Sequence, residues 1–438
     1  MRGTRWAIVA SLLSVIALVI AGCASNEEAP GGGNDACAKD KFGCVTYNSG
    51  DPVKLGTLLA ISGNTAFLGT DSQHGAALAV DHLDGTLDGK DGQLLGHSVT
   101  MVNEDDGCSK EGGQAGATKL AADPTIVGVI GTSCSSAALG VADKILSDKG
   151  ILLISPSNTA PNLTAEGTHQ PFYLRTAHND KIQGAAVADF AYNKLGAKSA
   201  ATAHDESPYA DALAAVFRES FKKLGGKITD SEAFQSTDTD FKPMLTKIAQ
   251  GKPDFLYYPD FDPACALIAK QAKQVAGLAS TKLTGSDGCL ESAYLKTGGK
   301  DVYLSYASGP DFSGLKTTNA FYADQFLPAY KKKFGTDPTA SFHAHAYDAT
   351  NMLFDAIKKV AINQNGKLQI PRTALKDAIF ATNNDKGLTG TLTCTPLGDC
   401  ATSVTIAVFQ APNFPVEGGN PNSKPVFTKT SSLEEVGG

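Results

Sequence analysis

Two short polar turns in the first half of the chain place hydroxyl groups where a small anion could bind. Each turn directly follows an apolar segment, one at 125–130 and the other at 151–154. The hydroxyl side chains of these turns are Ser135, Ser136, Ser157 and Thr159. Hydroxyls beside the free N–H groups of a helix start suit a carboxylate, and a helical pattern begins at residue 136. We therefore predict that Ser135 receives a carboxylate group.

The corresponding turns in the second half of the chain carry acidic and aromatic side chains instead. They contain Tyr209, Asp260, Phe261, Asp262 and Asp287. A carboxylate beside hydroxyl groups favours an ammonium group, so we expect Thr159 and Asp287 to share one. Tyr209 and Phe261 would cover the same ligand from the other side. The two sets of turns together predict a site for a zwitterion.

Each of these residues also has a purely structural interpretation. Ser135 could be the N-cap of the helix that follows it. Thr159 could satisfy a turn, and Asp287, which precedes a glycine, could be a turn residue. Their shared position favours a binding site, because ligands of open α/β sheets bind beyond the carboxyl ends of the strands.

The elements that would position these turns alternate between strand and helix patterns. In the first unit we expect strands at 53–61, 98–102, 125–130 and 151–154, with helices at 70–83, 115–122 and 136–148. In the second unit we expect helices at 181–195, 210–224, 241–250 and 264–276, with strands at 199–203, 228–233, 255–258 and 283–284. Continuous apolar strands between helices predict parallel sheets that are covered on both faces. Helices are then expected at 318–334, 344–362 and 372–381, followed by antiparallel strands within 391–410.

The first residues have the pattern of an export signal. Arg2 and Arg5 precede an apolar run at 6–20, which is too short for a comfortable membrane span. Ala21 and Gly22 then precede Cys23, as in a bacterial lipobox. We expect a signal peptide at 1–22, a lipid on Cys23 and an extracytoplasmic protein anchored to the membrane. The alternative is an ordinary signal peptide with an incidental cysteine.

The remaining cysteines favour disulfide bonds. The chain has nine cysteines, and eight remain once Cys23 is set aside. Neighbouring cysteines pair as Cys37 with Cys44, Cys108 with Cys134, Cys265 with Cys289, and Cys394 with Cys400. Disulfides persist in exported proteins, although eight cysteines allow 105 connectivities. No CxxC motif indicates a metal site, and we expect neither metal nor cofactor.

Composition sets the class of protein. Hydrophobic residues make up 42% of the chain and charged residues 19%, as in a soluble globular protein. The net charge of −7 does not favour nucleic acid as a partner. Residues 23–52 are rich in Gly, Asn and Asp and predict a flexible tether, which leaves enough chain for two domains. The P-loop, nucleophile-elbow, dinucleotide-binding and HExxH motifs do not occur, so we expect a binding protein and not an enzyme.

Several short motifs resemble type I periplasmic binding proteins, especially the leucine/isoleucine/valine-binding proteins of ABC importers. They are 61–63 with Gly69, the acidic turn that ends at Cys108, 134–136, 150–156 with Thr159, 175–177, 183–184 and 346–349. The resemblance implies two doubly wound parallel-sheet lobes joined by a three-stranded hinge. It places residues 53–175 and 306–392 in the first lobe, and 176–305 and 393–438 in the second. The crossings would fall near 175–176, 304–305 and 391–393.

The resemblance also implies roles for single residues. A disulfide would join Cys108 to Cys134. Ser135 and Thr159 would hold the carboxylate and the ammonium group of an amino acid, Asp287 would pair with the ammonium, and Tyr209 would line the second lobe. A large aromatic side chain of the first lobe falls near Phe67 and Leu68, and we assign Leu68 to the ligand site. The permease subunits of an ABC transporter would be the partners.

Two departures from the family pattern leave the ligand open. The amino-acid binders have the longer Glu where this chain has Asp287, and Phe261 stands where Tyr is common. Asp260 and Asp262 add carboxylates nearby. Amides, urea and small aromatic acids are therefore alternatives to an amino acid, and a sensing role is an alternative to transport.

Overall fold

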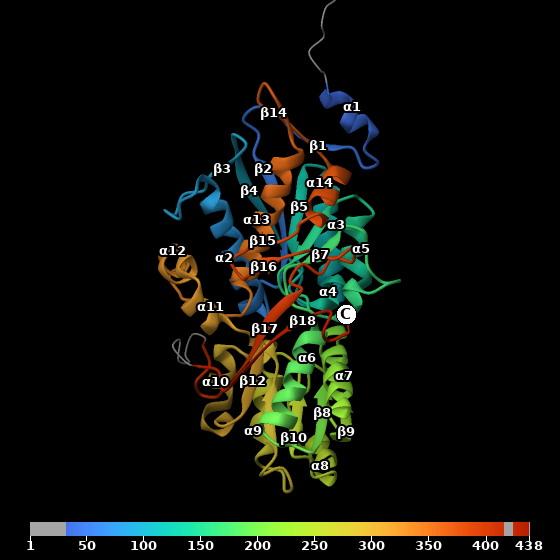
Figure 1. Ribbon diagram of the computed structural model, residues 1–438, viewed down its shortest axis with the longest axis vertical. Helices are drawn as coiled ribbons and strands as arrows, with labels where there is room; N and C mark the ends of the chain where they lie inside the picture. The colour runs from blue at the N-terminus through green and yellow to red at the C-terminus, as the bar shows by residue number, and fades with distance from the viewer. Residues whose placement is uncertain (1–31, 416–423, 438) are drawn as a thin grey trace, which may run out of the picture.

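The computed structural model describes residues 32–415 and 424–437, which form two α/β lobes stacked along the long axis of the molecule (Figure 1). The first sheet contains β3 (Gln93–Leu94), β4 (His97–Asp105), β2 (Val53–Leu59), β5 (Ile126–Gly131), β6 (Leu152–Ser155) and β7 (Tyr173–Arg175), in that order. Its strands from β4 to β7 are parallel, as predicted for a doubly wound lobe.

Helices cover both faces of the first sheet because successive strand residues point to opposite sides. Leu152 and Ile154 of β6 pack with α13 (His343–Val360) and α14 (Arg372–Phe380). Leu153 packs on the other face with α3 (Lys110–Ala122) and α5 (Asp143–Ser147). This alternation of side chains is the reason that the strands read as continuous apolar runs.

The second sheet has seven strands. They are β18 (Phe427–Ser432), β17 (Ser403–Gln410), β12 (Tyr306–Pro310), β11 (Lys282–Gly285), β10 (Phe255–Tyr258), β8 (Ser199–His204) and β9 (Lys227–Ala233), in that order. One face packs against α6 (Asp180–Asp189) and α7 (Pro208–Lys223). The other packs against α8 (Lys242–Gln250), α9 (Ala264–Ala272) and α10 (Ser292–Gly298). The predicted fold class is confirmed in both lobes.

The lobe boundaries differ from the expected ones at two crossings. β12 was expected in the first lobe, but it pairs with β11 and β17 in the second sheet, so the second crossing follows Pro310. Cys400 packs in the first-lobe core, so the third crossing falls between it and β17 and not at 391–393. The first crossing lies between Arg175, which pairs in the first sheet, and α6, which packs on the second. An apolar strand pattern does not say which sheet a strand joins, and this is why both later boundaries were misplaced.

The predicted tether is folded from residue 32 onward. Helix α1 (Gly32–Lys39) is followed by β1 (Cys44–Tyr47), which pairs antiparallel with β14 (Lys367–Pro371). Val45 and Tyr47 are buried in the first-lobe core, and the Tyr47 hydroxyl donates to the Thr125 carbonyl oxygen at 2.6 Å. The expectation of a flexible segment at 23–52 was therefore wrong for the described part. The segment is polar overall, and this composition gave no sign that Val45 and Tyr47 are core residues. The signal peptide and Cys23 lie outside the described residues.

The cysteines join in the four expected pairs, Cys37–Cys44, Cys108–Cys134, Cys265–Cys289 and Cys394–Cys400. All four bridges are local in sequence. The expected helix at 318–334 is present from residue 320, as a π-helical turn at Tyr322–Phe326 that continues directly into α12 (Leu327–Phe334), and the separate helix α11 (Phe312–Thr318) precedes it. Within residues 32–415 and 424–437, no helix combines the length and the apolar character needed to cross a membrane.

A buried arginine joins the segments that meet at the hinge. Arg175 ends β7 and is fully buried, and its Nε donates to Asp399 Oδ1 at 2.7 Å. Its Nη1 donates to the carbonyl oxygens of Asn158 (3.1 Å) and Ala160 (2.9 Å). Its Nη2 donates to the Thr164 hydroxyl at 2.7 Å. One guanidinium group thus fixes the turn that contains Thr159 and the loop that returns to the second lobe.

We predict that Asp399→Ala lowers the free energy of unfolding by about 3–5 kcal/mol, because it leaves the Arg175 guanidinium buried without its carboxylate. Urea unfolding followed by circular dichroism measures the change. Asp385→Ala removes an exposed carboxylate of the same part of the chain and is the control. A loss below about 1 kcal/mol, the range of an exposed pair, would contradict this role for Arg175.

We also predict that Tyr47→Ala destabilises the protein by about 3–5 kcal/mol, because the ring fills a closed part of the core. Thr46→Ala, on the less buried side of the same strand, is the matched control. Thermal unfolding of both variants is the measurement. An unchanged transition for Tyr47→Ala would mean that β1 does not contribute to the fold.

Candidate ligand-binding site

The first-lobe part of the site begins at Ser135, directly after the disulfide-bonded Cys134. Ser135 is buried, and its hydroxyl accepts a hydrogen bond from the Ala160 N–H at 3.2 Å. It starts α4 (Ser135–Ala137), a single turn, because Leu139 and Gly140 leave the helical conformation. The expected continuous helix 136–148 is therefore wrong. Ser135 offers its hydroxyl and local N–H groups, without a long helix dipole behind them.

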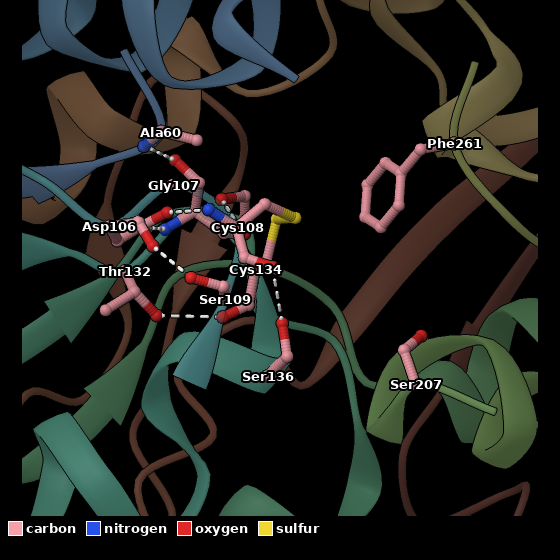
Figure 2. The surroundings of a disulfide bond; sticks show 12 residues. Ala60, Asp106, Gly107, Cys108, Ser109, Thr132, Cys134, Ser136, Ser207 and Phe261 are labelled. Atoms are coloured by element: carbon pink, nitrogen blue, oxygen red, sulfur yellow. Dashed lines mark hydrogen bonds between the residues drawn. A yellow bond between two sulfur atoms is a disulfide. The ribbon is translucent and has the colours of Figure 1, made fainter. Parts of the chain in front are cut away.

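Two of the predicted hydroxyls have structural partners. The Ser136 hydroxyl donates to the Cys108 carbonyl oxygen at 3.0 Å (Figure 2). The Ser157 hydroxyl donates to the Ser133 carbonyl oxygen at 2.8 Å. Both side chains hold the turns of the sheet edge together. Their assignment to the ligand rested on position in the sequence, which does not tell a ligand contact from a turn contact.

Thr159 lies where the first lobe meets the hinge. It is buried, and its carbonyl oxygen accepts from the N–H of Asp180, the first residue of α6. Its side chain is close enough to lower the pKa of Asp180, although burial has the larger, opposite effect. Since Ala160 contacts Ser135, the two predicted first-lobe residues lie side by side.

The second-lobe part of the site is the carboxylate of Asp287, which follows β11. Its Oδ1 accepts from the Tyr209 hydroxyl at 2.8 Å and from Gln183 Nε2 at 2.9 Å. Burial, assisted by the charge of Asp287, raises the pKa of Tyr209 well above its ordinary value. The phenol therefore keeps its proton and can donate. These two bonds hold Asp287 in one orientation between the lobes.

Sequence reasoning missed the residues that support Asp287. Gln183 comes from α6, and its Oε1 lies 2.5 Å from His178 Nε2. Burial lowers the pKa of His178, so the imidazole is neutral and its Nε2–H donates to Gln183. That bond fixes the Gln183 amide with its NH₂ group toward Asp287. Gln183 belongs to the 183–184 motif of the family resemblance, from which we predicted no role for its side chain. His178 and Asp180 lie a few residues before it in the chain.

An apolar wall closes the site and includes residues of both lobes. The Phe261 ring lies 5.2 Å from the Tyr209 ring, centre to centre. Phe261 also packs against a cluster on the opposite side of the cleft, which comprises Phe67, Leu68, Cys108, Cys134, Ala177, Ala340 and Phe342. Figure 2 shows the Phe261 ring extending toward the Cys108–Cys134 disulfide, with Ser207 beside it. Leu68 and Phe261 thus belong to one apolar cluster.

Two further second-lobe carboxyl groups bond within their own loop. Asp260 accepts from the Phe261 N–H at 2.6 Å, and Asp262 accepts from the Ala266 N–H at 3.2 Å. Burial raises the pKa of Asp262 to about 7 and that of Asp260 well above its ordinary value. These groups are the local hydrogen-bond acceptors of the turn that carries Phe261.

The assembled site has three chemically different parts. Hydroxyl and N–H donors lie at Ser135. The Asp287 carboxylate is held by Tyr209 and Gln183. The apolar cluster around Leu68 and Phe261 is the third part. Each binding turn is next to a disulfide, since Cys134 precedes Ser135 and Cys289 follows Asp287 by two residues. Such an arrangement can bind a small molecule with separated negative, positive and apolar groups.

Comparisons with known proteins agree with this architecture. The family model described as "Periplasmic binding protein" matches residues 52–405. The Leu/Ile/Val-binding protein of Citrobacter freundii is 31% identical over 307 residues, which cover 69% of this chain and 78% of that protein. A branched-chain amino acid transporter substrate-binding protein from Streptococcus pneumoniae, solved with isoleucine, superposes with a TM-score of 0.71 at 25% identity and covers 87% of this chain and 99% of that one.

A solute-binding protein of an ABC transporter from R. palustris, solved with benzoate, shares the fold. Its TM-score is 0.67 at 21% identity, covering 87% of this chain and 95% of that one. The family is extracytoplasmic, and its members bind solutes for ABC transporters. With the match over 52–405 and the relative at 31% identity, the chain belongs to the periplasmic binding proteins of type I, in the family of the Leu/Ile/Val-binding proteins.

Proposed function

We propose that this protein captures an α-amino acid of the branched-chain type between its lobes and delivers it to the permease subunits of an ABC importer. The ligand carboxylate would lie at Ser135, and its ammonium group would lie between Thr159 and Asp287. Tyr209 and Phe261 would cover the ligand from the second lobe. The observation that carries the proposal is the buried Asp287 carboxylate, which Tyr209 and Gln183 hold in place.

The apolar wall supports an apolar ligand side chain. The first lobe contributes the apolar side chains of Phe67, Leu68 and Phe342, and the second lobe contributes that of Phe261. Burying a Leu-sized side chain there contributes ~1.5–3 kcal/mol. This wall begins at Cys134, next to Ser135, so a side chain that branches from the ligand's α-carbon lies within its reach.

Closure of the lobes over the ligand would connect binding to delivery. The carboxylate end belongs to the first lobe and the ammonium partner Asp287 to the second, so a zwitterion joins them. Excluding water strengthens both contacts. An importer can then distinguish the loaded form by the relative position of the lobes. A sensor could use the same change, so the permease assignment rests on the family.

A second candidate ligand is a small aromatic acid, which the benzoate-bound relative favours. An aromatic acid has a carboxylate for Ser135 and a ring for the apolar wall, but it has no cation for Asp287. Tyr209 and Gln183 give the buried Asp287 carboxylate hydrogen bonds but no positive charge, and an aromatic acid would add none, so this candidate explains less of the site. Amides share the same deficiency.

We further propose that Cys23 carries a lipid that anchors the protein to the membrane, on the basis of the residues that precede it. Twenty-two residues would be removed as the signal peptide. A diacylglyceryl group has two acyl chains. Two chains hold a protein stably at a membrane, whereas a single chain gives only weak, reversible binding.

We predict that Asp287→Ala raises the Kd for L-leucine by about 30-fold or more, that is by about 2 kcal/mol, because the ligand ammonium loses its buried partner. Isothermal titration calorimetry on the wild type and the variant measures the effect. Asp301→Ala, an exposed carboxylate of the same lobe, is the control and should bind normally.

The ligand set separates the candidates in the same experiment. Leucinamide lacks the carboxylate, and 4-methylpentanoate lacks the ammonium group, so both should bind more weakly than leucine. Equal binding of leucine by Asp287→Ala would refute the proposed site. Binding of benzoate together with failure of all amino acids would establish the second candidate instead.

For the anchor, we predict that Cys23→Ala moves the protein from the membrane fraction to the soluble extracytoplasmic fraction, because the lipid-bearing thiol is lost. Fractionation with immunoblotting measures this. Cys37→Ala, which removes a disulfide cysteine, should leave the distribution unchanged. Membrane association of Cys23→Ala equal to that of the wild type would exclude the lipid anchor.

A further inference from the structure

A second carboxyl group lies beside the position proposed for the ligand ammonium. Asp180 begins α6 just after the hinge turn, and its side chain is completely buried. Neither of its carboxyl oxygens has a hydrogen-bond partner among the described residues. The Asp180 N–H donates to the Thr159 carbonyl oxygen at 3.0 Å, and the Thr159 side chain is close enough to the carboxyl group to lower its pKa, against the larger effect of burial.

The charged and titratable groups around Asp180 do not neutralise it. They are Asp287 from the β11 turn, Arg175 from β7, His178 from the hinge turn, Tyr209 from α7 and Tyr257 from β10. Arg175 is already paired with Asp399. His178 is neutral and donates to Gln183. The remaining neighbours, Asp287 and the two phenols, bring no positive charge.

Two buried carboxylates without a cation between them cannot both remain ionised at low cost. Burial, followed by the charge of Asp287, raises the pKa of Asp180 well above its ordinary value. A primary ammonium group has three N–H donors, and Thr159, Asp180 and Asp287 offer three acceptors. The third donor of an amino-acid ligand therefore finds its acceptor at Asp180.

We propose that Asp180 is a second carboxyl partner of the ligand ammonium, and that it holds a proton in the ligand-free protein and releases it when the ligand binds. The inference rests on the proposed amino-acid site and adds a residue and a proton to it. On binding, the O–H bond of Asp180 breaks, the proton passes to solvent, and the carboxylate accepts an N–H of the ligand. The ligand keeps its own charge, so the step is balanced.

The direction of the pH dependence follows from this exchange. Below the pKa of Asp180 in the free protein, every binding event must expel a proton, so affinity rises with pH by close to tenfold per unit. Above that pKa the proton has already left, and affinity becomes constant. The ligand would thus bind more weakly in acid, although its own charge is unchanged there.

The test is calorimetric titration of L-leucine into the full soluble chain between about pH 5 and about pH 8, each point in two buffers of different ionisation enthalpy. The difference in apparent enthalpy gives the number of protons released. We expect about one proton per leucine at the acid end and none at the alkaline end. 4-Methylpentanoate, which has no ammonium group, should release none at about pH 6 and above, where its own carboxyl group is already ionised.

Two isosteric variants locate the proton. Asp180→Asn should abolish proton release, flatten the pH dependence of Kd and weaken leucine binding by tenfold or more at the alkaline end. Glu291→Gln changes another buried carboxyl group of the second lobe, whose pKa burial raises to about 7 and whose charged neighbours are Asp262 and Lys296. This control should retain the release.

The outcomes separate this inference from the proposed function. Leucine binding by the wild type without proton release overturns the inference and leaves the amino-acid site intact. If leucine binding still releases a proton in Asp180→Asn, the proton comes from another group, and this result also overturns the inference. If no amino acid binds, both proposals fail. Should Asp180→Asn not fold, the wild-type titrations with leucine and 4-methylpentanoate still decide whether an ammonium group displaces a proton.

Discussion

The buried guanidinium group of Arg175 is the constraint on which the rest of the structure depends. It ends the last strand of the first sheet, and four of its N–H donors reach the carbonyl oxygens of Asn158 and Ala160, the Thr164 hydroxyl and the Asp399 carboxylate. A planar, permanently charged group is suited to such a set, since it offers donors in several fixed directions. The binding turn of the first lobe and the strand crossing into the second are therefore positioned by one side chain.

The two lobes contribute different chemistry to the site for a physical reason. In the proposed site, the hydroxyl groups of Ser135 and Thr159 belong to the first lobe and the acidic side chain of Asp287 belongs to the second. Asp287 Oδ1 accepts from Tyr209 and Gln183 of its own lobe, so it does not bind the first-lobe donors in place of a ligand. The disulfides beside Ser135 and Asp287 hold both turns before a ligand arrives, which lowers the entropy lost on binding.

The folded segment at 32–52 bears on the anchor proposed at Cys23. Because β1 pairs with β14 and Cys37 is bonded to Cys44, the part of the expected tether from residue 32 onward belongs to the folded first lobe. Helix α1 lies at the end of the first lobe that is farthest from the second (Figure 1). An anchor on Cys23 would thus hold the first lobe and leave the second free to move.

The sequence by itself predicted the α/β class, most of the alternating helices and strands, the four cysteine pairs and the turns that carry Ser135, Thr159, Tyr209 and Asp287, because apolar periodicity and close spacing can be read from neighbouring residues. Tertiary structure alone decided which sheet receives β12, that β1 is core, and that the hydroxyls of Ser136 and Ser157 bind backbone carbonyls. It also revealed Gln183, His178 and Asp180. Their roles depend on contacts with Asp287, which is about a hundred residues away in sequence, and no local pattern records how buried polar groups at that separation pair.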